Sequence, residues 1–132
     1  PHRSELSDNH ALIIRGRKKS LLFMPDQDSW EETLGEEFGI VDWLKEMEVD
    51  IALIDGTFWN YDGITSRDVS EIPHPTVTET IGLLGNKKLG DPEILFIHFN
   101  HTNPLLREGS NECRHLSEMG WGISKQGAVY YL

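Results

Sequence analysis

The segment Glu93–Phe99, with the sequence Glu-Ile-Leu-Phe-Ile-His-Phe, constrains the fold of this chain more than any other stretch. It is almost uniformly apolar, whereas a strand with one face in water alternates apolar and polar residues. The run therefore predicts a strand buried on both faces, as in the middle of a parallel sheet. It leads directly into the polar loop Asn100–Pro104, where the chain leaves the sheet.

Apolar runs elsewhere predict the remaining elements, with Gly16–Lys19 as a hairpin turn. A capping-box match at Ser29 opens a helix that Gly35 keeps short. The alternation of strands and helices predicts an α/β class with a largely parallel sheet and right-handed crossovers. The other predicted elements are strands over 11–15, 20–24, 49–54 and 128–132, a helix over 38–47, a helix from Thr76 that Gly85 ends, and a short helix capped by Ser110.

Side chains that bind metals or transfer protons follow three of the predicted strands. They are Asp26, Asp55 and His98. Ligands of open α/β sheets gather at the carboxyl ends of the strands, so we expect these three side chains to meet at one rim. The stretch 56–75 has no periodicity and is long for a compact domain. It brings His74 to the start of a helix, where this histidine can join the other three.

The cysteine content restricts the chemistry of this rim. Cys113 is the only cysteine, which excludes an internal disulfide and a thiolate-rich metal cluster. A metal must therefore be held by carboxylate oxygen and imidazole nitrogen, the ligands that suit zinc, iron or manganese in the absence of sulfur.

Each of these residues also has a structural explanation. Asp26 and Asp28 are typical of turns and helix caps, and Asp55 before a glycine is an ordinary turn pair. A histidine between prolines, such as His74, is usually structural or solvent-facing. His98 is more unusual, because an imidazole at the end of an apolar strand needs a polar partner. Spacing alone leaves the structural and the functional explanation open.

The charge balance limits the partners of the chain. Twenty-two acidic and 12 basic side chains give a formal net charge of -10, which repels phosphate backbones and anionic lipid. The basic cluster falls in the predicted hairpin turn, at Arg15, Arg17, Lys18 and Lys19. No apolar run approaches the roughly 20 residues needed to cross a bilayer, and no charged-then-apolar leader opens the chain. We expect a cytoplasmic protein that binds neither nucleic acid nor membrane.

Three short motifs, taken together, resemble a known family. In chain order they are Leu53-Ile-Asp-Gly-Thr-Phe-Trp59, Ile72-Pro-His-Pro75 and Phe96-Ile-His-Phe-Asn-His-Thr-Asn-Pro-Leu-Leu106. They resemble the C-terminal half of the coenzyme PQQ synthesis protein B family, and Gly120–Leu132 is similar to the tail of that family. The resemblance implies the metallo-β-lactamase superfamily, whose fold is an αββα sandwich of two similar halves with a metal site along one edge.

The resemblance predicts the fold class and the domain organisation. Residues 1–132 are expected to form the C-terminal half of a metallo-β-lactamase-like domain, α/β in class (α+β by some schemes). Such a half has a mixed sheet with helices packed on one face. It leaves a sheet edge and an apolar face uncovered. We expect a missing N-terminal half, or a second copy of the chain, to cover them.

The resemblance also implies roles for four residues. Asp26 looks like the metal-bridging aspartate of the superfamily, and His98 looks like its last histidine ligand. Asp55 and His74 are similar to a proton-handling pair in the tRNA-processing members, where the carboxylate orients and charge-stabilises a histidine that acts as a general acid. The implied cofactor is zinc, as one or two ions, with iron or manganese as alternatives.

One part of the superfamily pattern is absent. The motif His-x-His-x-Asp-His is not found, and His98-Phe-Asn-His101 is its nearest approach. Two candidate ligands fall short of the three protein ligands of a catalytic zinc site. The chain alone is therefore expected to bind a catalytic metal weakly or not at all.

Two classes of function follow from these patterns. The first is a metal-dependent hydrolase-like protein, completed by an N-terminal half and acting on a small-molecule or peptide substrate. An oxidative step in PQQ biosynthesis is the alternative chemistry within this class. The second is a non-catalytic module of the same fold that has lost its metal and binds a protein partner. The presence of all four candidate residues favours the enzyme.

Overall fold

The hairpin predicted at the start of the chain forms one edge of the sheet. The computed structural model describes residues 10–35, 39–62 and 74–132, and in it β1 (Leu12–Arg15) pairs antiparallel with β2 (Ser20–Met24). The N–H of Gly16 donates to the carbonyl of Lys19 at 2.9 Å and closes the turn. The predicted hairpin is confirmed.

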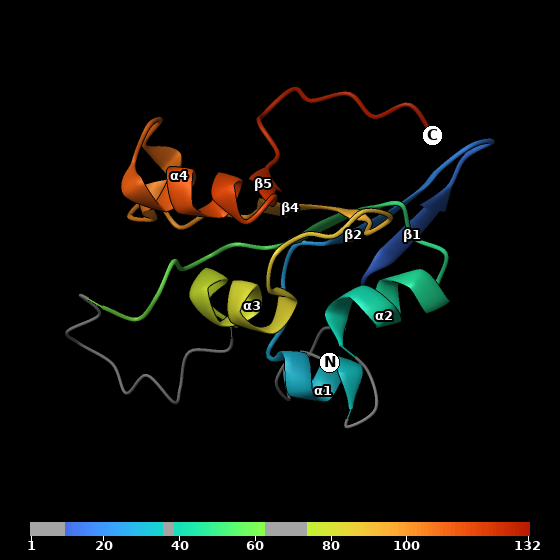
Figure 1. The fold of residues 1–132 in the computed structure, drawn as a ribbon, viewed down its shortest axis with the longest axis horizontal. Coiled ribbons are helices and arrows are strands. Elements are labelled where there is room, and N and C mark those ends of the chain that lie inside the picture. The colour runs from blue at the N-terminus through green and yellow to red at the C-terminus, as the bar shows by residue number, and fades with distance from the viewer. Residues whose placement is uncertain (1–9, 36–38, 63–73) are drawn as a thin grey trace.

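Three further strands extend the sheet from β2. They are β3 (Ile51–Asp55), β4 (Glu93–Ile97) and β5 (Gly122–Ile123), and the strand order is β1-β2-β3-β4-β5. The β2–β3, β3–β4 and β4–β5 pairs are all parallel, so the carboxyl ends of β2, β3 and β4 lie at one edge of the sheet (Figure 1). The predicted mixed α/β sheet is confirmed.

Three of the four α-helices begin where the capping side chains predict. The helices are α1 (Trp30–Leu34), α2 (Ile40–Glu46), α3 (Val77–Leu84) and α4 (Asn111–Glu118), with a 3₁₀ helix, η2, over Pro104–Leu106. Ser29, Thr76 and Ser110 each accept a hydrogen bond from the backbone N–H three residues further on. Gly35 ends α1 and Gly85 ends α3, both with φ above +60°. In the described part of the chain, no helix combines the length and the apolar character needed to span a membrane.

All four α-helices pack on the same face of the sheet. Alternate residues of the central strands, such as Leu22, Ile54 and Phe96, join one buried apolar cluster. The helices contribute to that cluster through Trp30 of α1, Ile40 and Leu44 of α2, Val77 and Ile81 of α3, and Leu116 of α4. The expectation of helices on one face is therefore confirmed.

The opposite face of the sheet is only partly covered. Leu21, Ile51 and Leu53 form a second, smaller cluster there, against which Leu95, Ile97, Tyr130 and Leu132 of the same chain pack. Toward the hairpin edge the apolar side chains lie open, with exposed fractions of 54% for Leu12, 50% for Ile14 and 38% for Phe23. The almost uniformly apolar β4 thus has one face under the helices, and in the described part of the chain its other face is covered by the C-terminal tail.

One predicted strand is wrong. Residues 128–132 form no strand; the last strand is β5, which pairs with Leu95 and Phe96 of β4. A turn beyond β5, in which Ala128 N–H donates to Lys125 at 3.1 Å, redirects the chain. The tail then crosses the open sheet face, where Tyr130 donates to Ser124 Oγ at 2.7 Å. The apolar residues of the tail pack on that sheet face. The sequence pattern alone did not distinguish such packing from the pairing of a strand.

The predicted helix over 38–47 is found as α2, Ile40–Glu46. Phe38, its first predicted residue, lies outside the described residues, as do the first two residues of the Ile72–Pro75 motif and residues 63–73 of the 56–75 loop.

Candidate metal centre

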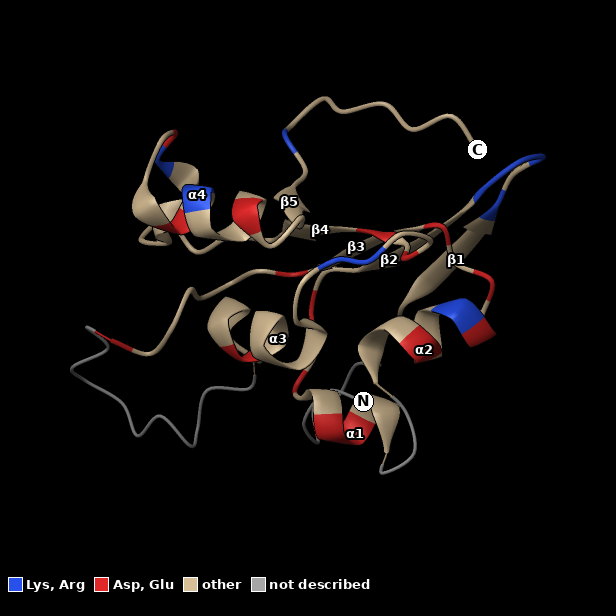
Figure 2. Ribbon diagram, viewed as in Figure 1, with Lys and Arg blue, Asp and Glu red and all other residues tan. Residues whose placement is uncertain are grey.

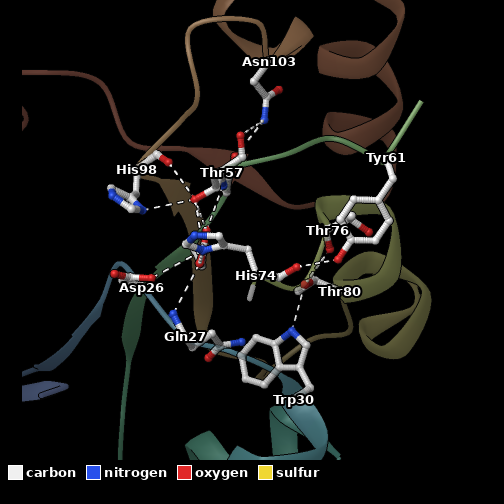
Figure 3. A network of polar contacts seen from close by, with 12 residues as sticks. Asp26, Gln27, Trp30, Thr57, Tyr61, His74, Thr76, Thr80, His98 and Asn103 are labelled. Carbon is white, nitrogen blue, oxygen red and sulfur yellow. Dashed lines mark hydrogen bonds and ion pairs between the residues drawn. The ribbon is translucent and has the colours of Figure 1, made fainter. Parts of the chain in front are cut away.

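The four predicted site residues come together at the carboxyl edge of the parallel strands. Asp26 follows β2, Asp55 is the last residue of β3, and His98 follows β4. His74 lies shortly before α3 and reaches the same edge. Figure 3 shows the side chains of Asp26, His74 and His98 in one network of polar contacts. Asp26 and His98 therefore lie on the same side of the molecule, as a shared site requires.

Asp55 is the innermost group of this network. Its side chain is fully buried, and its Oδ1 accepts from the N–H of Thr57 at 2.8 Å and from the Thr57 hydroxyl at 2.7 Å. Its Oδ2 accepts from the N–H of Gln27 at 3.3 Å and lies 2.7 Å from Nδ1 of His74. An ionised carboxylate can only accept, so Nδ1 of His74 carries the proton in this contact.

His74 is fixed from several sides. Its carbonyl accepts from the Tyr61 hydroxyl at 2.7 Å, and its ring lies edge-on to Phe58, with centroids 6.0 Å apart. Nδ1 is also 3.4 Å from Oδ1 of Asp26. One ring nitrogen of His74 therefore faces two carboxylates.

The surroundings of His74 shift its acidity. Burial by itself lowers the pKa of His74, but the hydrogen bond to Asp55 and the negative charges of Asp55, Asp26 and Asp28 outweigh it. The net effect raises the pKa above its ordinary value of 6.5. The ring is thus stabilised in its protonated form, as a proton donor requires.

The loops after β3 and β4 are joined by backbone contacts that position His98. Gly56 N–H donates to Ile97 at 2.8 Å, and Asn100 N–H donates to Thr57 at 2.9 Å. The buried amide of Asn103 donates to the Gly56 carbonyl at 2.7 Å. A Cβ on Gly56 would lie 2.8 Å from the Ile97 carbonyl oxygen, so only glycine permits this approach.

His98 has an unusual backbone conformation at this junction. Its φ is +60°, in the left-handed region, which costs a residue with a Cβ about 1–2 kcal/mol. Its Nδ1 lies 3.1 Å from the hydroxyl of Thr57. The strand thus ends in a strained turn that directs the imidazole toward the network, and the polar partner expected for this histidine is Thr57.

Three of the four groups lie close enough together to be candidate ligands of one metal ion. One ligand atom from each of Asp26, Asp55 and His74 can be chosen so that all lie within 4.8 Å of one another. Ligand atoms around a tetrahedral zinc ion are roughly 3–3.5 Å apart, given metal–ligand distances of about 2.0–2.2 Å. Two carboxylates and an imidazole also suit zinc, iron or manganese. The chemistry of the donor set therefore fits a metal ion. This triad differs from the ligand pair expected from the sequence, because it contains Asp26 but not His98 and includes Asp55 and His74, which the resemblance assigns to proton transfer.

Comparisons with known proteins agree with the fold and with this chemistry. No protein-family model matches the chain. Coenzyme PQQ synthesis protein B of Nitrosococcus oceani is 32% identical over 138 residues, covering 96% of this chain and 42% of the relative. The protein of the same name from Acinetobacter baumannii strain ACICU is 28% identical over 137 residues, covering 96% of this chain and 43% of the relative.

A solved structure matches as well. It is Zn²⁺-bound PqqB from Methylobacterium extorquens, with a TM-score of 0.69 and 25% identity over 92% of this chain and 43% of that one. The chain is coenzyme PQQ synthesis protein B-like. Its fold is that of part of a metallo-β-lactamase domain. It spans about two fifths of the length of the PQQ synthesis protein B relatives that it matches.

Two contributors to this site were not predicted from the sequence. Thr57 touches Asp55, His74 and His98, yet it was noted only as part of a motif. Its position, two residues after Asp55 and inside that motif, was the available signal. Gln27 contributes through its backbone N–H, which no side-chain pattern could have revealed. The other described histidines, His10, His101 and His115, are exposed and outside the network.

Proposed function

We propose that this chain carries part of the active site of a metal-dependent, hydrolase-like protein of the PQQ synthesis protein B type. The observation that carries the proposal is the convergence of all four candidate residues at the carboxyl ends of the strands, where Nδ1 of His74 lies 2.7 Å from Asp55 and 3.4 Å from Asp26 and His98 joins them through Thr57. The similarity to a Zn²⁺-bound PqqB supports zinc as the ion. We propose that one or two zinc ions bind, with iron or manganese as the alternatives.

Within this site we assign Asp26 and His98 to the metal and the Asp55–His74 pair to proton transfer. The 2.7 Å contact between Asp55 and Nδ1 of His74 supports the pair, because it occupies Nδ1 with a proton. A bound metal ion would supply Lewis acidity and would lower the pKa of water. Asp55 orients the His74 ring, and His74 delivers its proton to a leaving group.

The experiment is metal analysis of the protein at its full natural length, in the wild type and in four variants. We expect stoichiometric metal in the wild type, its loss in Asp26→Ala and His98→Ala, and its retention in His74→Gln. Asp50→Ala, at the opposite edge of the sheet, is the matched carboxylate control and should keep the metal.

Two results would redirect the proposal. Metal loss in His74→Gln would make Asp26, Asp55 and His74 the ligand set, with no separate proton-handling pair. Absence of metal from the wild type would favour the second candidate, a non-catalytic module that binds a protein partner.

The open face of the sheet supports a proposal about the rest of the domain. A groove of about 550 Å³ on this face is lined by Ile14, Leu21, Phe23 and Leu53, among others. More than half the length of the matched relatives lies outside the region similar to this chain. We propose that an N-terminal half of the domain covers this face and supplies the remaining ligands.

Light scattering tests this partner. The chain alone should self-associate through the open face, and coexpression with the N-terminal half should give a stable one-to-one complex. A stable monomer with a cooperative thermal transition would contradict the half-domain proposal.

The reaction itself is proposed only by class. The substrate is a small molecule or a peptide, and the chemistry is hydrolysis or, as the alternative, an oxidative step in the PQQ synthesis that the relatives are named for. The net charge of -10 supports the prediction that neither nucleic acid nor a membrane is a partner. Location in the cytoplasm stays a prediction.

A further inference from the structure

Thr57 occupies the centre of the network, and no role follows for it from the proposed function. It is buried, with an exposed fraction of 8%. Its hydroxyl oxygen lies 2.7 Å from Asp55 Oδ1, 3.1 Å from His98 Nδ1 and 3.5 Å from His74 Nδ1. It thus links the carboxylate to both imidazoles (Figure 3).

Counting protons decides the direction of these hydrogen bonds. A threonine hydroxyl has one proton to donate. Both Asp55 Oδ1 and the His98 carbonyl, at 3.2 Å, can only accept. The bond to Asp55 is shorter and charge-assisted, so it takes the hydroxyl proton. The remaining contact, with Nδ1 of His98, can then form only if that nitrogen donates.

We propose that Thr57 is a positioning residue, whose hydroxyl donates to Asp55 and accepts from Nδ1–H of His98. This holds neutral His98 in the tautomer with its lone pair on Nε2. The hydrogen bond made by one ring nitrogen of a histidine fixes the role of the other. Outer partners that orient a metal-binding histidine act in this way.

The same carboxylate sets the tautomer of His74. Oδ2 of Asp55 holds the proton on Nδ1 of His74 directly, at 2.7 Å, while Oδ1 acts on His98 through Thr57. The two rings lie with centroids 6.1 Å apart. One buried carboxylate therefore prepares two imidazoles, each with Nε2 as the nitrogen that accepts a proton or binds a metal.

The first part of this inference, the tautomer of His98, holds with or without a metal. The second part, that Thr57 strengthens metal binding by His98, rests on the proposed function. The two are tested separately, in the protein at its full natural length. Long-range ¹H–¹⁵N correlation of the histidines in metal-free protein, at a pH where the rings are neutral, reports each tautomer. A His98→Gln variant assigns the His98 signals.

We expect the Nδ1–H pattern for His98 in the wild type and in Thr57→Ser. Thr57→Val keeps the shape but removes the hydroxyl, so His98 should show the averaged shifts of a mixture, while His74 keeps its pattern. Thr102→Val is the control, since among the described residues Thr102 makes its side-chain hydrogen bond within the exposed turn at Asn100. Its spectrum should match the wild type.

Zinc affinity, measured by competition with a chromogenic chelator, is the second readout. Thr57→Val should bind zinc about 10–100-fold more weakly, as is typical when an outer partner of a ligand is removed. Thr57→Ser should restore the affinity. A merely structural role of Thr57 would leave the tautomer of His98 unchanged.

An Nε2–H pattern for His98 in the wild type overturns the inference by itself. The test therefore stays decisive even if the Thr57→Val protein fails to fold. An unchanged His98 pattern in a folded Thr57→Val protein overturns it equally. If the wild type shows the expected tautomer but binds no zinc, the proposed function fails and the positioning role stands.

Discussion

Carboxylates at the amino ends of the parallel strands, the amino edge, and at their carboxyl ends, the carboxyl edge, make different contacts. At the amino edge, Asp91 accepts from the Lys45 ammonium at 2.8 Å and from the Lys88 N–H at 2.8 Å. Asp50 accepts from the N–H of Ser20 at 2.7 Å. These carboxylates meet a cation or a backbone N–H, and they close turns at the start of strands.

At the carboxyl edge, the carboxylates face imidazoles and one another. Asp55 is buried against His74 and Thr57, and Asp26 lies 3.4 Å from the same His74 nitrogen. Figure 2 shows acidic residues on α1, the helix that follows Asp26 in the chain, and basic residues concentrated at the tip of the β1–β2 hairpin. Titratable groups gathered at the carboxyl ends of strands are typical of functional sites, whereas the carboxylates at the amino edge make structural contacts.

Removing a carboxylate from each edge should show the largest difference. Asp55→Ala leaves His74 and two Thr57 donors without their acceptor, so we expect a loss of about 3–5 kcal/mol in the free energy of unfolding. Asp50→Ala should cost about 1 kcal/mol, the typical value of one hydrogen bond. Urea unfolding of both variants measures this. Equal losses would mean that Asp55 is as ordinary a turn residue as Asp50.

Glycine substitution tests how tightly the carboxyl edge is joined. In Gly56→Ala the new Cβ meets backbone at 2.8 Å, and we expect a destabilisation of about 1–3 kcal/mol together with weaker metal binding. Gly82→Ala, inside α3, meets nothing within 4 Å and should stabilise by about 0.5–1 kcal/mol. Thermal unfolding with metal analysis distinguishes the two, and a Gly56→Ala protein with normal stability and metal content would show that the close approach is dispensable.

The two edges should also respond to pH in opposite ranges. The raised pKa of His74 means that its contribution to stability is complete below pH 6.5 and is lost as the pH rises through the folded-state pKa. The hydrogen bond from Lys45 chiefly lowers the pKa of Asp91, so that contribution is present above 3.8 and is lost as the pH falls through the lowered pKa.

Unfolding of metal-free protein across pH measures this difference. His74→Gln should destabilise more in mildly acidic than in alkaline buffer, and Asp91→Asn should destabilise near neutrality with an effect that fades in acid. A His74→Gln effect that grows with pH would contradict the assigned pairing.

The Lys45 side of the ion pair at the amino edge should have the smallest effect. Lys45 is 47% exposed while the Asp91 side chain is 6% exposed, and Asp91 keeps the hydrogen bond from the Lys88 N–H without Lys45, so we expect a loss of about 1 kcal/mol or less. Lys45→Ala should therefore change the unfolding midpoint little and the metal content not at all. Loss of metal in this variant would remove the functional distinction between the two edges.

The sequence by itself determined the local structure and the candidate residues. Apolar spacing and capping side chains act over a few residues, so the hairpin, α1, α3 and α4, and strands β2 to β4 were predictable, and the polar residues after those strands were visible as candidates. The strand predicted at 128–132 is wrong, because an apolar tail of the same composition can either pack on a sheet face or pair at a sheet edge.

The tertiary structure alone decided which groups touch. The contacts of Asp55 with His74, of Asp55 with Gln27 and of Thr57 with His98 join residues 19, 28 and 41 positions apart. Such contacts depend on strand order, on register and on the strained turn at His98, none of which a local pattern encodes. The central place of Thr57 exists only because parallel pairing of β3 and β4 brings two distant loops within hydrogen-bond distance.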